Sequence, residues 1–433
     1  MDCVGGLPWL SAFTRAQRRA LKIAALVAIL PAPARVSAAP PPQTQPGKTD
    51  ERRRVEFGVI PLVGGDTDVG AGVGELSSLV GLPASSKRAP YRWGLESSAF
   101  ISFKPGVEGQ SFIIPYQDYY VQWTAPELMG GRLRLEARPS FTQETTQRYY
   151  GLGNASPAPA SDVRARDFYG RTHPMLWVRA RYRFWSSLNF GLGAYYTQNW
   201  MKIPAGGTLA TQMASGDPLV RDLLGQSRRH GVLLFESLLL YDSRNEEIDT
   251  DRGQFHQIKV RVSPRLNDEV PYAYQQLNLT SRFFYTVIPD RLVLAARVLV
   301  DLQFGHPPFY ELARYDDTYA LGGVNGVRGV PGQRYYGKVK VFTNWEARVR
   351  VGNFHLFGKA MIFGLAAFAD AGRAWTELGA SHPELDGRGW GLKYGVGGGV
   401  RLTQGKTFVV RGDLAWSPDA RPIGGYVNAG QMF

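Results

Sequence analysis

The chain has 433 residues, of which 44% are hydrophobic, 20% charged and 12% aromatic, and its formal net charge is +13. That length suits one large domain or two to three ordinary ones. The single cysteine, Cys3, excludes a disulfide framework and a cysteine metal site, and no run of about 18 apolar residues after the N-terminal segment predicts a membrane-spanning helix.

Residues 1–38 have the pattern of a secretion signal. A basic stretch that includes Arg15 and Lys22 precedes an apolar stretch at 23–30, and small residues at 36–38 offer a cleavage position. The alternative interpretation is a short buried helix. Removing the signal takes away a net charge of +4 and leaves +9. Residues 39–54 are polar and proline-rich, which predicts a disordered periplasmic linker with no core of its own.

From residue 55 onward, apolar and polar side chains alternate with a period of two, which predicts β-strands. In 292–304 and 339–351, one face is apolar and the other carries polar and charged residues. The strands run to about 10–15 residues, longer than the usual five or six, and many apolar faces end in aromatic residues. A transmembrane β-barrel with an apolar outside, a polar inside and aromatic girdles fits better than a soluble sandwich.

The alternation predicts sixteen antiparallel strands, so residues 55–433 are expected to form an all-β, 16-stranded transmembrane barrel. The predicted strands are 55–63, 67–82, 91–103, 112–126, 131–146, 167–185, 187–201, 230–243, 253–265, 272–287, 291–304, 336–351, 354–371, 389–403, 406–416 and 424–433. Short turns such as Gly352-Asn353 alternate with long connections at 147–166, 202–229, 305–335 and 372–388. Membrane barrels have this asymmetry, with short turns in the periplasm and long loops at the surface.

Sixteen strands can enclose an aqueous lumen, and the alternation points many basic residues into it. They are Arg132, Arg134, Arg138, Arg179, Arg181, Arg183, Lys259, Arg261, Arg348 and Arg350. A basic lumen favours anions, so a passive pore for anionic solutes is one functional hypothesis. No basic patch on a helix or RNA-binding fold points to nucleic acid.

No sequence motif supports an enzyme. The chain has no H-E-x-x-H metal motif and no G-x-S-x-G nucleophile motif. A barrel enzyme that acts on lipid stays a third hypothesis without a motif. We therefore expect no enzyme activity, no metal and no cofactor.

Six segments in order carry a family resemblance. They are YYGLGNAS (149–156), YALGGVNGVRG (319–329), WEARVRV (345–351), FADAGRAW (368–375), YGVGGGVRL (394–402) and YVNAGQMF (426–433). Together they resemble the bacterial surface antigen superfamily of sixteen-stranded outer-membrane barrels. Its members include the central subunit of the β-barrel assembly machinery, the translocation-and-assembly-module barrel and the two-partner secretion transporters.

The resemblance implies a loop lock inside the lumen. In the family, the sixth surface loop folds inward and its arginine-glycine tip meets the acidic residue of the thirteenth strand. Carried over, Arg328 and Gly329 form the tip, and Asp370 and Gly372 belong to the strand motif. Glu346 is the expected inward acid of the preceding strand. A guanidinium and a carboxylate can pair in two parallel hydrogen bonds. The sequence departs from the family at Val330, where an aromatic residue is usual.

The resemblance also implies a terminal-strand insertion signal, here with Phe433 as the last aromatic and Gly430 three residues before it. A girdle aromatic is the simpler interpretation of Phe433, and the two are compatible. The last strand must pair with the first, which removes two edges.

The function implied by the family is insertion or translocation of proteins, or of lipids, at the outer membrane of a Gram-negative bacterium, through a seam between strands one and sixteen. Expected partners are outer-membrane lipid and an unfolded outer-membrane or secreted protein client. About sixteen residues separate the cleavage site from the first strand, too few to fold as a domain. We therefore expect a stand-alone form without polypeptide-transport-associated domains, which a periplasmic lipoprotein or chaperone could assist.

Overall fold

The computed structural model describes most of the chain after residue 53. The described residues are 54–82, 91–106, 111–157, 168–225, 228–316, 318–319, 321–356, 359–380, 382–404, 408–419 and 423–433. The predicted signal peptide and nearly all of the predicted linker lie outside them. Within these ranges, no helix has the length and apolar character needed to cross a bilayer.

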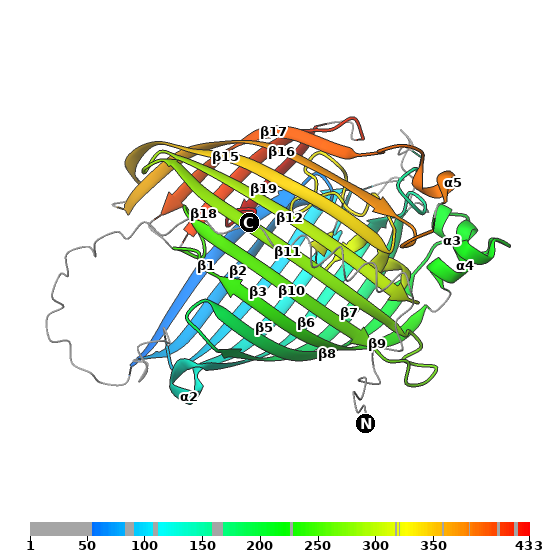
Figure 1. Cartoon of the computed structure of the whole chain (residues 1–433), viewed down its shortest axis with the longest axis horizontal. Helices are drawn as coiled ribbons and strands as arrows, with labels where there is room; N and C mark the ends of the chain where they lie inside the picture. The colour runs from blue at the N-terminus through cyan, green and yellow to red at the C-terminus, as the bar shows by residue number, and fades with distance from the viewer. Residues whose placement is uncertain are drawn as a thin grey trace, which may run out of the picture.

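Sixteen long strands form one closed antiparallel barrel, as predicted (Figure 1). They are β1 (Arg54–Asp66), β2 (Gly70–Leu82), β3 (Trp93–Pro105), β5 (Tyr116–Glu127), β6 (Leu133–Arg148), β7 (Phe168–Arg183), β8 (Leu188–Lys202), β9 (Arg229–Asp242), β10 (Gly253–Ser263), β11 (Tyr274–Ile288), β12 (Leu292–Gly305), β15 (Val339–Leu356), β16 (Lys359–Trp375), β17 (Lys393–Gln404), β18 (Phe408–Trp416) and β19 (Gly424–Ala429). Each strand pairs with the next, and β19 pairs with β1 to close the ring. The short β4 (Phe112–Ile113) pairs with β3.

The barrel has an apolar outside and a polar inside. Phe57, Val63 and Trp345 point outward and are 68%, 74% and 57% exposed. Asp301 on β12 and Lys340 on β15 are opposite each other in register and fully buried inside, with Lys340 Nζ 2.7 Å from Asp301 Oδ2. The period of two in the sequence therefore marks the two faces, because alternate side chains of a strand point to opposite sides.

Three predicted boundaries are wrong. The strand expected at 112–126 is divided into β4 and β5. The turn expected at Gly352-Asn353 lies inside β15, which continues to Leu356 because a bulge after Arg350 absorbs the irregularity. The last strand ends at Ala429 instead of 433, because Gly430 has a φ of +84° and turns the chain out of the sheet.

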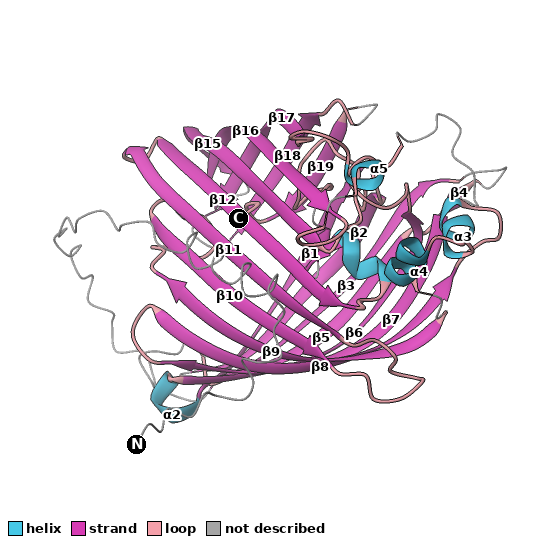
Figure 2. Ribbon diagram, turned by 45° about the vertical axis from the view of Figure 1, so that its right-hand side comes forward, coloured by secondary structure: helices cyan, strands magenta, loops and turns pink. Residues whose placement is uncertain are grey.

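The long loops pack together at one end of the barrel. Short helices α3 (Thr208–Met213), α4 (Pro218–Leu224) and α5 (Pro383–Asp386) lie at that end, whereas α2 (Leu128–Gly131) replaces the predicted turn at the opposite end (Figure 2). Leu209, Leu223 and Leu224 share a buried apolar core with Tyr336 and with the 3-10 helix η3 (Phe309–Ala313). The loops are therefore joined to one another by a core of their own.

Candidate functional site

The longest described connection, residues 306–338 between β12 and β15, folds back into the barrel. We call it the long loop. It holds η3, a small hairpin of β13 (Arg314–Tyr315) and β14 (Thr318–Tyr319), and the glycine-rich tip predicted from the sequence. The side chain of Arg328 at this tip is fully buried.

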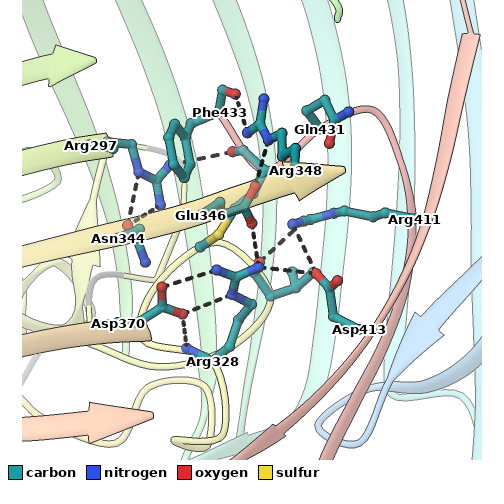
Figure 3. A network of polar contacts seen from close by, with 12 residues as sticks. Arg297, Arg328, Asn344, Glu346, Arg348, Asp370, Arg411, Asp413, Gln431 and Phe433 are labelled. Carbon is teal, nitrogen blue, oxygen red and sulfur yellow. Dashed lines mark hydrogen bonds and ion pairs between the residues drawn. The ribbon is translucent and has the colours of Figure 1, made fainter. Parts of the chain in front are cut away.

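Arg328 pairs with Asp370 of β16 in a two-pronged contact (Figure 3). Its Nε donates to Asp370 Oδ2 at 2.8 Å and its Nη2 donates to Asp370 Oδ1 at 3.0 Å. The backbone N–H of Arg328 also donates to Oδ2, at 3.0 Å. One carboxylate therefore holds both the side chain and the backbone of the loop tip. Charge-assisted bidentate pairs of this kind are the strongest hydrogen-bonded contacts that proteins make.

Two further carboxylates reach the same guanidinium. Nη1 of Arg328 donates to Glu346 Oε1 at 2.6 Å and to Asp413 Oδ2 at 3.2 Å. The guanidinium carbon also lies 3.4 Å from the centre of the Phe368 ring, as in a cation–π contact. Burial alone lowers the pKa of Arg328, but Asp370, Glu346 and Asp413 reverse this and raise it above its ordinary value. The loop tip therefore carries a permanent charge.

Three arginines from the wall complete the set. Arg348 Nε donates to Glu346 at 2.8 Å, Arg401 Nη1 donates to Asp413 at 2.5 Å, and Arg411 Nη1 lies 3.5 Å from Asp413. We call the whole set the lumenal ion cluster: Arg328, Glu346, Arg348, Asp370, Arg401, Arg411 and Asp413. It contains four positive and three negative side chains, from the long loop and from β15 to β18.

Glycines make room for the loop tip. Gly329 has a φ of +90°, a conformation that L-residues rarely adopt. A Cβ on Gly395 of β17 would lie 1.8 Å from the carbonyl oxygen of Arg328, and one on Gly372 would lie 2.3 Å from Leu321 of the loop. The glycines of the strand motifs therefore let the loop backbone approach the wall closely.

The loop tip also contacts residues on both sides of the seam, one on β19 and one in the turn after β1. The backbone N–H of Gly329 donates to the hydroxyl of Tyr426 on β19 at 2.8 Å. The backbone N–H of Gly332 donates to Asp68, in the turn between β1 and β2, at 2.7 Å. Val330 is fully buried in an apolar cluster with Leu321 and other lumenal residues. The tip is therefore held by apolar packing as well as by charge.

The end of the chain turns into the lumen. Phe433 is 6% exposed and packs against Phe284. Its carbonyl oxygen accepts a hydrogen bond from Arg348 at 3.1 Å, and Arg297 lies over its ring (Figure 3). Phe433 is therefore not a girdle aromatic in this conformation, because the positive φ of Gly430 directs the last residues away from the lipid face. The insertion-signal role of Gly430 and Phe433 stays a prediction.

The seam between β1 and β19 is short. Only Gly65–Val427 and Asp66–Tyr426 are paired in register, with one further bond from the N–H of Thr67 to the carbonyl of Gly425 at 3.2 Å. On its other side, β1 pairs with β2 along all 13 of its residues. The register between β1 and β19 therefore covers two residues of β1, whereas the register between β1 and β2 covers all 13.

Comparison with known proteins agrees with this architecture. The Omp85 superfamily domain matches residues 115–431. The chain belongs to the Omp85 superfamily. This confirms the resemblance predicted from the ordered motifs, and it makes the chain an integral outer-membrane barrel of a Gram-negative bacterium.

Solved structures share the fold. The BamA protein of Haemophilus ducreyi lacking POTRA domains 1–3 aligns with a TM-score of 0.57 at 12% identity, over 88% of this chain and 70% of that chain. CdiB from Escherichia coli aligns with a TM-score of 0.52 at 12% identity, over 87% of this chain and 62% of that chain. Comparison with curated protein sequences gave no match.

Three wall residues of the lumenal ion cluster in this Omp85 barrel were not predicted from the sequence: Arg401, Arg411 and Asp413. Asp413 and Arg411 stand two apart in the strand segment TFVVRGDLAW, so alternation alone places both on the inward face. Arg401 likewise alternates with glycines on β17. The alternation could have identified these residues, because inward charges of opposite sign on neighbouring strands must pair when water is scarce.

The lumen is less basic than its positive residues suggest. Arg179 lies 2.6 Å from Glu236, and Arg314 of the long loop lies 2.8 Å from Glu144 on β6. Lys259 and Arg261 also pair with carboxylates. Arg132, predicted to point inward, is exposed beside α2. A cavity of about 780 Å³ remains between the loop and the wall, and it reaches β1 and β19 at the seam.

Proposed function

We propose that this Omp85 barrel inserts or translocates proteins at the outer membrane by opening the seam between β1 and β19. The observation that carries the proposal is the short pairing between β1 and β19, which consists of two register pairs and one further backbone hydrogen bond. Strand edges in a bilayer are stable only when their backbone groups are paired, and an edge that becomes exposed is a template for another strand. An unfolded protein client has the strands that such an edge accepts.

The interactions on the two sides of the seam support this proposal. Two register pairs hold β1 to β19, so few hydrogen bonds must break for the seam to open. The long loop contacts Asp68 on one side and Tyr426 on the other. Movement of the loop therefore changes contacts on both sides of the opening.

The passive anion pore is the second hypothesis from the sequence, and no observation favours it. Acidic side chains neutralise much of the basic lumen. The surface loops share a buried core, and Arg334 donates to Ser156 Oγ at 2.6 Å to join two of them. We likewise propose a transport role rather than an enzymatic one. A periplasmic lipoprotein or chaperone as a partner belongs to the same proposal.

A disulfide across the seam tests the proposal. The register of the two strands brings position 63 opposite position 429 when their pairing is extended, because Gly65 pairs with Val427. A Val63→Cys/Ala429→Cys variant is reconstituted into vesicles, and insertion of an unfolded outer-membrane protein is followed by protease protection. The oxidised barrel should lose insertion and regain it after reduction.

The matched control places the disulfide on the other side of β1. Phe57 pairs with Leu79 of β2, so Phe57→Cys/Leu79→Cys links two strands that are already paired. This variant should insert clients whether oxidised or reduced. Full insertion by a completely oxidised seam variant would refute the proposal. Ion conductance by both the oxidised and the reduced barrel, with no insertion by either, would favour the pore.

A further inference from the structure

The long loop has a second anchor, far from Arg328. Asp316 lies at the turn of the hairpin formed by β13 and β14, with a φ of +57° that aspartate tolerates better than most residues. Its carboxylate contacts both Lys259 and Arg261 of β10. The hairpin is held nearby as well, because Arg314 pairs with Glu144 on β6. The loop therefore binds two separate parts of the barrel wall.

The wall around Asp316 is strongly cationic. Arg261 Nε lies 3.0 Å and Lys259 Nζ 3.6 Å from Glu236 Oε2 on β9, and Arg179 Nη2 of β7 lies 2.6 Å from Glu236 Oε1. We call Arg179, Glu236, Lys259 and Arg261 the β10 cluster. Three positive charges and one negative charge give these four side chains a formal net charge of +2, and Asp316 lowers it to +1.

The β10 cluster faces open space. Arg179, Lys259, Arg261 and Asp316 all line the lumenal cavity, which extends to residues 62–66 of β1 and 427–429 of β19. The side chains of Lys259 and Arg261 are only 4% and 3% exposed, whereas that of Asp316 is 23% exposed. The carboxylate therefore covers the two cations on their cavity side, where a molecule that enters the cavity could replace it.

We infer that the β10 cluster is a carboxylate-binding site, that Asp316 occupies it in the closed barrel, and that an acidic side chain of a client segment takes its place when the long loop moves. This inference rests on the proposed function, because it names the part of a protein client that the lumen recognises. Buried cations that lose their anion are strongly disfavoured. A replacement carboxylate removes that penalty, so client entry and loop release become linked.

A peptide carboxylate fits this site because the occupant already present is one. Asp316 presents its carboxylate from the turn of a two-stranded hairpin, to a lysine and an arginine that both donate to it. A hairpin of an unfolded outer-membrane protein has the same shape, with polar turn residues. A lipid phosphate is the competing ligand chemistry, and the experiment below separates the two.

The test measures peptide binding to the purified full-length barrel in detergent. The probe is a fluorescent peptide with the sequence of residues 309–319, and its partner has asparagine in place of both aspartates, at positions 316 and 317. An Asp316→Asn barrel should bind the acidic probe at least 10-fold more tightly than the asparagine probe. The wild-type barrel, whose site is occupied, should bind both weakly. Adding Lys259→Gln and Arg261→Gln to Asp316→Asn should abolish the preference.

Asp118→Asn is the matched control, because Asp118 is another acid of the cavity lining, on β5, and its carboxylate accepts from Thr142 instead. This variant should behave like the wild type. Equal binding of the two probes by Asp316→Asn would overturn the inference. Displacement of the acidic probe by phosphatidylglycerol, with no preference between the probes, would assign the site to lipid phosphate and also overturn it.

A second measurement does not depend on folding of the Asp316→Asn variant. Ala313 is 1% exposed and lies in η3, next to the hairpin. Thiol labelling of Cys3→Ser/Ala313→Cys, in a barrel that keeps Asp316, should speed up several-fold with excess acidic probe and stay constant with the asparagine probe. Neither the peptide-binding assay nor the labelling assay requires client insertion. A negative result in them would overturn the inference about Asp316, whereas a negative result in the seam experiment would overturn the proposed function.

Discussion

Replacing Arg328 by methionine should release the loop tip, and the structure sets the size of the effect. Glu346 and Asp413 each keep arginine partners when Arg328 is lost. Asp370 keeps no other ion pair among the described residues. An orphaned buried charge costs about 3–5 kcal/mol. At about 1.4 kcal/mol for each factor of ten, the equilibrium between docked and undocked loop should shift by roughly 100- to 4,000-fold.

Thiol labelling of a buried position reports this equilibrium. Val330 is fully buried beside the tip, and Cys3 is the only native cysteine, so Cys3→Ser/Val330→Cys has one reactive group. Its labelling rate follows the population of the open state when closing is fast. Arg328→Met should raise the rate at least 100-fold.

The double variant Arg328→Met/Asp370→Asn supplies the internal control. It removes both members of the pair, so most of the protection should return. A labelling rate for Arg328→Met within a factor of two of the parent would show that Arg328 does not hold the tip. Equal labelling rates for the double and the single variant would show that the orphaned carboxylate of Asp370 is not the cause of release.

Three further predictions concern other parts of the barrel. Phe433→Ala leaves a cavity at a packed lumenal position and should lower the free energy of unfolding by about 3 kcal/mol. Urea titrations followed by heat-modifiable gel migration measure it, and an unchanged urea midpoint would show that the tail is undocked. Burial and then Asp66 raise the pKa of Asp68 to about 7, despite attraction by Lys104. Its contribution to stability is therefore present below about pH 4 and lost as the pH rises through 7, and Asp68→Asn should remove this pH dependence from urea titrations. Arg334→Ala breaks the bonds to residues 156 and 157, so limited proteolysis of the surface loops should accelerate while the melting temperature of the barrel changes little.

The strands could be predicted because lipid and lumen impose opposite demands on alternate residues. The segment 339–351 shows both faces in full, and it lies within β15. The Gly352-Asn353 pair resembles a turn locally, but a bulge keeps it within the strand. The sequence alone does not distinguish a bulge from a turn here, because a glycine such as Gly352 is common in both. The end of β19 was missed for a similar reason, since only the positive φ of Gly430 directs the tail inward.

The site was predictable only in part. Family resemblance placed Arg328, Asp370 and Glu346, and the structure brings these three together. The contact of Asp316 with β10 has no sequence signature. It depends on where the hairpin of the long loop lies across the lumen. The local sequence around residue 316 does not indicate that it lies next to residues 259 and 261. Long-range contacts inside a lumen depend on which strands face each other across the closed barrel, and residues adjacent in sequence do not determine this.

The position of the long loop has a consequence for the order in which the barrel is made. Arg328 contacts Asp413, which lies 85 residues later in the chain, and Arg314 contacts Glu144, which lies 170 residues earlier. A tip with a fully buried charge cannot be threaded easily into a finished ring. We therefore expect the loop to dock while the wall strands are still gathering, before β1 and β19 meet. On this expectation, the short register between β1 and β19 forms last during assembly, at the same junction that we propose opens during function.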